Sequence, residues 1–324
     1  MAPLVGDTPH AAARLGWGSD ILGFDTERST DHGWGPKVEV FVADGDVEPV
    51  RASIESGLPA EVRGWPTQFG WDDNPVTHHV TVTTLGGWLE AQLGLDPRVG
   101  VSTGQWLTTP QQMLLEVTAG AVFHDDPGEL TRIREELAWY PDDVWLWLLA
   151  CQWRRIDQEE PFVGRTAEVG DELGSRILAA RLARDAMRLC FLQERRYAPY
   201  PKWLGSGFAQ LEAAAVLAEP LRELVVATDF ETREERLVEV VRELAARHNR
   251  LGVTPPVDES IGLFHSRPFR VLGSSRFVDA CLERVSDPWL RSLPLVGAID
   301  QFVDSTDVLS KPAVFPRAKA FFEL

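Results

Sequence analysis

The pattern of hydrophobic residues changes once along the chain, and this change restricts it to an architecture of two parts. Short runs rich in β-branched residues stand at Val38–Ala43 and His79–Thr83 and are bounded by Gly, Pro, Asp or Asn, as strands are. Residues 142–155 are instead apolar nearly all round, which predicts a buried helix. We therefore expect an α+β fold, with a small mixed β-sheet and flanking helices in residues 1–127 and an all-α domain in residues 128–324.

Helix signals occur in both parts of the chain. Pro110 stands early in one predicted helix, and Gly252, followed by Pro255 and Pro256, ends another. The predicted helices are Leu85–Leu93, a segment opened by Pro110, Glu129–Trp139, Asp142–Arg155, Arg165–Arg195 as one helix or a pair, Gly207–Leu217, Arg233–Leu251, and short helices among the loops of 260–324.

Charge and hydropathy argue against several classes of protein. The formal net charge is −17 and the sequence shows no basic stripe, so we expect no nucleic-acid partner. The longest apolar run, Val144–Cys151, is shorter than the about 20 residues that a membrane-spanning helix needs. The first residues have neither the basic nor the apolar region of a signal peptide. We expect a cytoplasmic protein with a small-molecule substrate and no membrane partner, and the sequence leaves its oligomeric state open.

Cysteines and histidines predict no zinc site. Cys151, Cys190 and Cys281 are far apart and stand beside apolar residues, which is typical of buried free thiols. No pair of histidines and cysteines has the spacing of zinc ligands. We interpret the segment His124–Asp126 as a turn rather than a metal site.

The most informative segment is Gly18–Asp20, which is followed by Asp31–Gly33 and a predicted strand. A Gly-Ser pair at a helix start lets backbone N–H groups approach phosphate oxygens. A D-x-D pair at a strand edge turns both carboxylates to one face, where they hold Mg²⁺ against the phosphates of a nucleoside triphosphate. Eleven residues separate Ser19 from Asp31, which fits the nucleotidyltransferase signature. We expect Gly18 and Ser19 to bind nucleotide and Asp31 to bind Mg²⁺ as a catalytic residue.

Four runs resemble one bacterial family, the domain of unknown function 4037 (DUF4037). The first is ARLGWGSDILGFDTERSTDHGWGPKVEVF at Ala13–Phe41. The others are Tyr140–Ser175, Leu189–Gly205 and Asp300–Asp307, so the resemblance covers nearly the whole chain. It implies a nucleotidyltransferase-like domain of the polymerase-β-type fold, followed by a helical domain, and it names no substrate.

The chain departs from the pattern of that family at its acidic residues. Family members usually read D-H-D, and here Gly33 replaces the second carboxylate. The wider superfamily has a third carboxylate on a later strand, but His79–Thr83 offers only threonines. A magnesium site without these ligands loses much of its protein ligation. Asp20, Asp25 or Glu39 are the candidate substitutes.

Other candidate residues lie later in the chain. Lys202 and Arg165 are expected to neutralise triphosphate charge, and Glu116 or Glu172 to act as the base that deprotonates an acceptor. The alternative for Lys202 is a Pro-rich turn between helices. The alternative for Arg165 and Glu172 is a helix start with a capping carboxylate and a solvated face.

Two hypotheses of function follow from these patterns. In the first, the protein is an enzyme that transfers a nucleoside monophosphate from a magnesium-bound triphosphate to a hydroxyl or amine of a small molecule. In the second, it is a catalytically degenerate relative that binds a nucleotide or metabolite, acts within an assembly, or has acquired another activity in the same cleft. Gly33 favours the second hypothesis.

Overall fold

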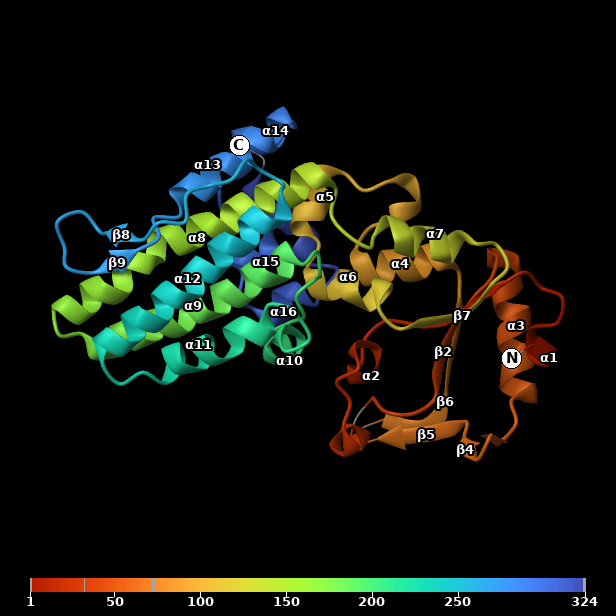
Figure 1. Ribbon diagram of the computed structural model, residues 1–324. Helices are drawn as coiled ribbons and strands as arrows, with labels where there is room; N and C mark the ends of the chain where they lie inside the picture. Colours follow the sequence, from red (N-terminus) through yellow and green to blue (C-terminus); the bar gives the residue numbers. More distant parts are fainter. Residues whose placement is uncertain (1, 32, 72–73, 323–324) are drawn as a thin grey trace. The chain divides into compact units, whose positions relative to one another are not determined.

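The computed structural model describes residues 2–31, 33–71 and 74–322, with Ala2 and Asp31 described by their backbone alone (Figure 1). Within these ranges no helix combines the length and the apolar character that crossing a membrane requires. The cytoplasmic location stays a prediction.

The chain divides into two compact units. Unit 1 comprises Met1–Ala138 and Asp307–Ala318, and unit 2 comprises Trp139–Thr306 and Lys319–Leu324. The composition of the sequence changes at residue 127, whereas unit 1 extends to Ala138. The reason is that the next helix of the chain, α7 (Glu129–Glu136), packs against the last strand of the sheet in unit 1 and against the helix that precedes this strand.

Unit 1 contains the small mixed sheet that the sequence predicts. Its strands are β1 (Ala11–Arg14), β2 (Lys37–Phe41), β5 (Gln68–Trp71), β6 (Asn74–Thr83) and β7 (Ala121–Asp125). Their order is β5-β6-β2-β1-β7; β2 and β6 pair in parallel, and the other neighbours pair antiparallel. The patterns predicted β2 and β6 but neither β1 nor β5. A separate hairpin is formed by β3 (Glu61–Val62) and β4 (Trp65–Pro66).

Helices surround this sheet within unit 1. They are α1 (Ala2–Val5), α2 (Ser19–Leu22), η1 (Glu27–Asp31), η2 (Asp44–Asp46), α3 (Val47–Gly57), α4 (Leu85–Leu93), η3 (Pro97–Val99), α5 (Thr103–Thr108), α6 (Gln111–Thr118) and α7 (Glu129–Glu136). The predicted bounds of α4 are confirmed, and the helix opened by Pro110 is α6, for which Pro110 is the N-cap residue. The helix α3 was not predicted.

The two faces of the sheet differ in polarity because side chains alternate along β2. Val38 and Val40 lie on the face covered by α1 and α3, where Val50 and Ile54 of α3 complete an apolar core (Figure 1). Lys37 and Glu39 occupy the intervening positions of β2 and therefore belong to the other face. The sheet thus has one apolar face and one that carries ionisable side chains.

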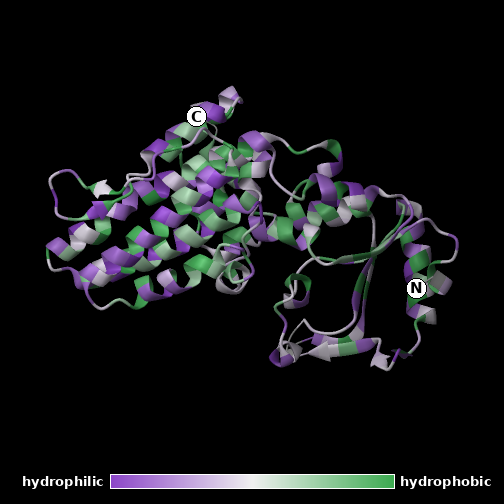
Figure 2. Ribbon diagram, viewed as in Figure 1, coloured by the Kyte–Doolittle hydropathy of each residue, from purple (hydrophilic) through white to green (hydrophobic). Residues whose placement is uncertain are grey.

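Unit 2 is helical, as the sequence predicts, apart from one two-stranded sheet. Its elements are α8 (Asp142–Glu168), α9 (Glu172–Gln193), α10 (Leu204–Phe208), α11 (Ala214–Val226), α12 (Phe230–Leu251), β8 (Gly262–Leu263), β9 (Arg270–Val271), α13 (Ser275–Arg284), α14 (Pro288–Ser292) and α15 (Ile299–Phe302). The helices α16 (Thr306–Leu309) and η4 (Phe315–Phe321) follow, and most of their residues fall in the segment Asp307–Ala318 of unit 1. Figure 2 shows hydrophobic and hydrophilic residues on each long helix, as packed amphipathic helices require.

The structure changes two helix predictions for unit 2 and decides a third between its two alternatives. The helix expected to end at Arg155 continues through Pro161 to Glu168, because its residues on both sides of the proline are buried in the core. Of the two alternatives for residues 165–195, one helix or a pair, the structure shows parts of two helices, the end of α8 and all of α9. The segment Gly207–Leu217 is divided between α10 and α11.

A buried histidine links three parts of unit 2. The indole N–H of Trp153 donates to Nδ1 of His248 (3.2 Å), and Nε2 of His248 lies 3.0 Å from the hydroxyl oxygen of Thr254. Since an indole only donates, Nδ1 accepts and Nε2 carries the hydrogen, which describes the neutral ring. Burial lowers the pKa of His248 from 6.5 to about 4.

We expect His248 to make the stability of unit 2 sensitive to acid. The folded pKa lies below the unfolded one, so its contribution is present above pH 6.5 and is lost as the pH falls toward 4. The loss in the free energy of unfolding amounts to about 3 kcal/mol by pH 4. Urea unfolding followed by tryptophan fluorescence at several pH values measures it, with His248→Gln as the comparison. If the two pH profiles run parallel, His248 does not titrate in this way.

Candidate nucleotide site

A pocket of about 280 Å³ lies in unit 1 beside α2 and the loop that leads into β2. It is lined by Ser19, Asp20, Asp25, Ser29, Gly33, Trp34, Gly35, Pro36 and Trp65. The rings of Trp34 and Trp65 meet edge to face with centroids 6.0 Å apart. The pocket therefore combines aromatic walls with hydroxyl, carboxylate and glycine groups.

Arg14, at the end of β1, holds the loop that forms one side of this pocket. Its Nε and Nη2 donate to the two carboxylate oxygens of Asp20 at 2.8 and 3.0 Å. It also donates to the backbone oxygens of Leu15 (2.5 Å) and Trp17 (3.1 Å). A bidentate pair of this kind fixes both partners. Asp20 is thus engaged by a cation of the protein itself.

Glu39, in the middle of β2, is also engaged. Its Oε2 accepts the backbone N–H of Leu15 at 2.9 Å, and its Oε1 lies 3.7 Å from Nη1 of Arg14. Burial raises the pKa of Glu39, although the Leu15 hydrogen bond and Arg14 oppose the shift. The carboxylate therefore helps to position the loop after β1.

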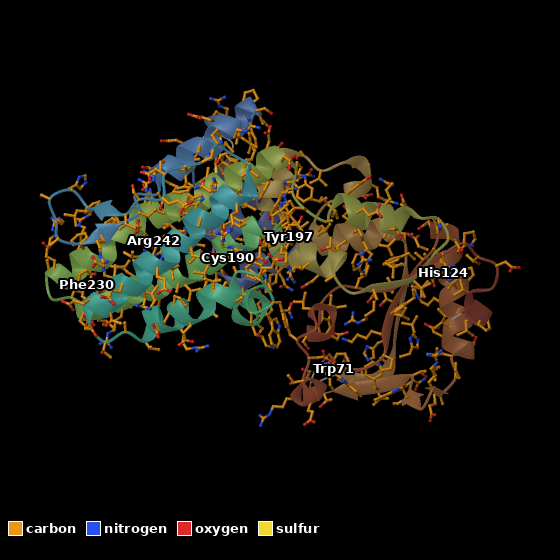
Figure 3. The ribbon with its side chains drawn as sticks, viewed as in Figure 1. Trp71, His124, Cys190, Tyr197, Phe230 and Arg242 are labelled. Carbon is orange, nitrogen blue, oxygen red and sulfur yellow. The ribbon has the colours of Figure 1, made fainter. Side chains whose placement is uncertain are left out.

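Lys37 differs from Asp20 and Glu39 in that its charged group makes no hydrogen bond to the described residues. Its ammonium nitrogen is buried and has no hydrogen-bond partner within the described residues. It lies 4.1 Å from the ring centroid of Trp17 and 5.2 Å from that of Trp71, the residue labelled in Figure 3. Burial, and then the charge of Arg14, lower the pKa of Lys37 to about 8. The cation–π contacts partly replace the lost hydration of the ammonium group.

The sequence reasoning missed Lys37 although a signal for it exists. The alternation in Lys37–Phe41 places its lysine and Glu39 on one face and two valines on the other. An ionisable residue at the first position of a predicted strand, directly after the signature segment, is the pattern that would have identified it.

Some residues of the predicted nucleotide-binding signature lie within the part of the chain that the structure describes, and others do not. Ser19 lines the pocket, and Gly18 precedes the four-residue α2 with φ 140°, where an added Cβ would lie 2.2 Å from Oδ1 of Asp20. Only glycine therefore fits at that position. Asp31 ends η1, before the loop that leads to β2, so it does not stand on the strand edge. The side chain of Asp31 and the whole of His32 lie outside the described residues.

Gly33 is held in a conformation that excludes a side chain. Its φ is +64°, in the left-handed region, and an added Cβ would lie 2.4 Å from an atom of the Trp17 ring. The same Cβ position is 3.6 Å from the ammonium nitrogen of Lys37. An acidic residue here would need Trp17 to move and would then stand beside Lys37.

The described side chains do not form the two-carboxylate magnesium site that the signature implies. Position 33 offers no ligand, Arg14 binds Asp20, and Glu39 accepts a backbone N–H. On β6, Thr81 pairs with Glu39, so this strand adds no carboxylate at that level of the sheet. Asp25 lines the pocket. Magnesium at a nucleotide site is held by one or two carboxylates together with the phosphates, so the described side chains lack the paired form of such a site.

Glu116 lies beneath the loop that follows β1. It is buried on α6, and its carboxylate accepts hydrogen bonds from the side-chain amides of Gln112 (3.0 Å) and Gln92. Its backbone oxygen accepts the N–H of Gly16 at 2.7 Å. Burial raises the pKa of Glu116, opposed by the two glutamine amides. Glu116 is not among the described residues that line the pocket.

The other predicted site residues lie in unit 2. Arg165 stacks on Phe162 within α8 (5.6 Å to the ring centroid), and the Nζ of Lys202 lies 4.8 Å from the ring of its neighbour Trp203. Glu172 begins α9, while Lys202 follows its far end, and a helix of 22 residues is about 33 Å long. Glu172 and Lys202 therefore lie at opposite ends of α9.

Glu172 has a partner that explains its position. Its carboxylate accepts from both Nη atoms of Arg233 (2.8 and 3.1 Å) and from Nε of Arg176 (2.9 Å). Arg233 is fully buried and also donates to Ser175 and to the backbone oxygen of Ala227. Arg233, and then Arg176, lower the pKa of Glu172. The pair joins the first turns of α9 and α12.

Comparison with known proteins identifies one family. Residues 106–204 match the family model described as "Domain of unknown function (DUF4037)", which confirms the resemblance to that family. The match covers the end of unit 1 and the start of unit 2. A search of the curated proteins and a search of the solved structures found no match.

We expect Glu172→Gln to destabilise unit 2, because the substitution leaves the buried Arg233 without its counter-ion. The melting temperature should fall by several degrees. Glu283→Gln, which neutralises an exposed carboxylate of α13, is the control and should leave it unchanged. A variant as stable as the control would show that Glu172 does not support the fold and would return it to the catalytic candidates.

We expect Gly33→Ala to destabilise unit 1 by about 1–3 kcal/mol, because the new Cβ meets Trp17 at a left-handed backbone position. Chemical denaturation measures the difference. Gly45→Ala is the matched control, since a Cβ at Gly45 meets nothing within 4 Å. Equal stability of the two variants would contradict the steric account of Gly33.

Proposed function

Residues 106–204 match the DUF4037 family, and from this premise we propose that the chain is a nucleotidyltransferase-like protein whose unit 1 binds a nucleoside triphosphate. The observation that carries the proposal is the ammonium group of Lys37. It is buried, has no hydrogen-bond partner within the described residues, and adjoins the pocket-lining Gly33. A buried cation without a hydrogen-bonded counter-ion is stabilised by an anionic ligand.

The chemistry of the pocket suits a nucleoside triphosphate. Phosphate oxygens would accept from the hydroxyl of Ser19, and the glycines at 33 and 35 would let the backbone approach closely. Lys37 is not itself a lining residue; it would attract the phosphates from behind Gly33. Trp34 and Trp65 offer aromatic surfaces on which a base can stack. The net charge of −17 supports a small nucleotide rather than a polynucleotide as the ligand.

Binding without transfer is the form of the proposal that the geometry supports best. Arg14 neutralises Asp20, and Gly33 supplies no carboxylate, so the described residues leave the magnesium-dependent reaction without a paired acidic site. Glu116, the candidate base in unit 1, is turned to two glutamine amides.

Transfer of a nucleoside monophosphate to a hydroxyl or amine of a small molecule is the second candidate function. The order of the motifs favours it, because Gly18 and Ser19 follow the first strand and Asp31 precedes the second, as in the signature. In this case Asp31 would hold Mg²⁺ against the phosphates. Metal-bound triphosphate would then be the substrate rather than a passive ligand.

Calorimetric titration with ATP, with and without Mg²⁺, tests the proposal. We expect binding in both conditions and at least a tenfold loss of affinity in Lys37→Met, which keeps the packing against the tryptophans but removes the charge. Lys311→Met removes an exposed lysine that pairs with Asp307 and should bind as the wild type does. Lys202→Met shows whether that residue contributes. Failure to bind ATP, GTP, CTP and UTP would exclude the nucleotide proposal.

Release of pyrophosphate separates the two candidate functions. Magnesium-dependent release in the presence of small hydroxyl and amine acceptors, abolished in Asp31→Asn, would establish transfer. Binding without release supports the first form of the proposal. Gly33→Asp is a less clean test, because its side chain would displace Trp17 and approach Lys37 as well as adding a carboxylate.

A further inference from the structure

The β1–β7 edge of the sheet brings together two histidines and a carboxylate. Ala12 pairs with His124 in the antiparallel register, and the N–H of Asp126 donates to the backbone oxygen of His10 at 3.0 Å. His10 directly precedes β1, two residues before Ala12, and Asp126 directly follows β7, two residues after His124. Because the pairing continues to these flanking residues, alternation turns all three side chains to the same face.

Their distances show that they already interact. Nε2 of His124 lies 2.8 Å from Oδ2 of Asp126, and Nδ1 of His10 lies 3.7 Å from the same oxygen. The two imidazole rings have centroids 4.3 Å apart. One potential ligand atom of each residue lies within 4.8 Å of those of the other two. Bound to one cation, such ligands stand about 3 Å apart, so the side chains would rotate to bring their lone pairs to a common centre.

A neighbouring carbonyl orients the buried member of the group. Nδ1 of His10 lies 2.9 Å from the backbone oxygen of Thr8, and a carbonyl oxygen only accepts, so Nδ1 carries the hydrogen. This leaves the lone pair of His10 on Nε2. A ring N–H donated to a carbonyl is the arrangement that fixes the tautomer of metal-binding histidines. His10 is 8% exposed, which limits its freedom further.

We propose that His10, His124 and Asp126 bind a divalent transition metal of the Zn²⁺ class. Zinc binds imidazole nitrogens as well as carboxylate oxygens, whereas magnesium and calcium bind mainly oxygen ligands. A set of two imidazoles and one carboxylate therefore favours zinc. The side chains of His124 and Asp126 are 44% and 48% exposed, so the remaining coordination positions would face solvent. The cation would take the place of the hydrogen that His124 and Asp126 share, and that proton would pass to solvent.

This site is separate from the pocket of the proposed function. The histidine cluster lies at β7, one edge strand of the sheet. Trp71, whose ring contacts Lys37, lies on β5, the opposite edge strand. Figure 3 labels both His124 and Trp71. Ala12 also pairs with Val40, so the histidines share the face of the valines, and Lys37 belongs to the other face. Metal binding here needs no nucleotide.

Titration of the metal-free full-length protein with Zn²⁺ tests the proposal by calorimetry, and Co²⁺ absorption reports the ligand set. We expect one site in the wild type and at least a tenfold weaker affinity in His124→Ala and in Asp126→Asn. Both side chains are half exposed, so these variants should fold, and circular dichroism checks this. His265→Ala removes an exposed histidine of unit 2 and is the matched control, which should bind as the wild type does.

Three results would overturn the inference. They are the absence of zinc binding to the wild type, binding that survives both cluster substitutions, and binding weakened equally by His265→Ala, which would indicate adsorption to surface histidines. Loss confined to the two cluster variants, with Mg²⁺ unable to compete, establishes the site.

Discussion

The bidentate contact between Arg14 and Asp20 organises the polar side of unit 1. It joins the end of β1 to the start of α2, and the same guanidinium binds the backbone oxygens of Leu15 and Trp17. The loop with the Gly-Ser pair therefore has one defined conformation. The contact also determines which charges are available to a ligand. Since Asp20 is satisfied within the protein, Lys37 is left as the ionisable group with a buried atom and no hydrogen-bond partner among the described residues.

The sheet of unit 1 separates two kinds of chemistry on its two faces. One face is covered by α3 through Val40 and Ile54, and the histidine cluster stands where this face reaches the β7 edge. The other face carries Lys37 and Glu39 beside the aromatic pocket. Strand alternation alone produces this separation, because adjacent residues of a strand point in opposite directions. An anionic ligand and a soft divalent cation would thus bind without competing.

Buried polar groups in unit 2 hold segments of the fold together. Arg233 ties α9 to α12 through Glu172, and Glu160 on α8 accepts the backbone N–H groups of Leu272 and Gly273. Burial raises the pKa of Glu160 to about 7, although the two N–H groups oppose the shift. Such groups are costly to bury unless each finds a partner. An acidic residue at a helix start in this unit therefore has a structural explanation before a catalytic one.

Local patterns in the sequence determined the order and type of the main elements. The alternation of β2 and β6, the bounds of α4, the end of α12 and the helical character of the second half all follow from periodicity and caps that act over a few residues. The resemblance to DUF4037 could also be recognised from the sequence, and the match over residues 106–204 confirms it. The strand β1 could not be predicted from the sequence, because Ala-Ala-Ala-Arg has neither a high strand propensity nor an alternation of apolar and polar residues.

Only the tertiary structure decided which distant residues meet. His10 and His124 are brought together by the register of two strands that lie far apart in the chain, and no local spacing encodes that register. The engagement of Asp20 by Arg14, and the exclusion of a side chain at Gly33 by Trp17, likewise depend on how a loop folds back on itself. The sequence by itself therefore determined the α+β architecture and the candidate signature. Packing and strand pairing, which join residues without regard to their separation, decided which groups of that signature remain available for chemistry.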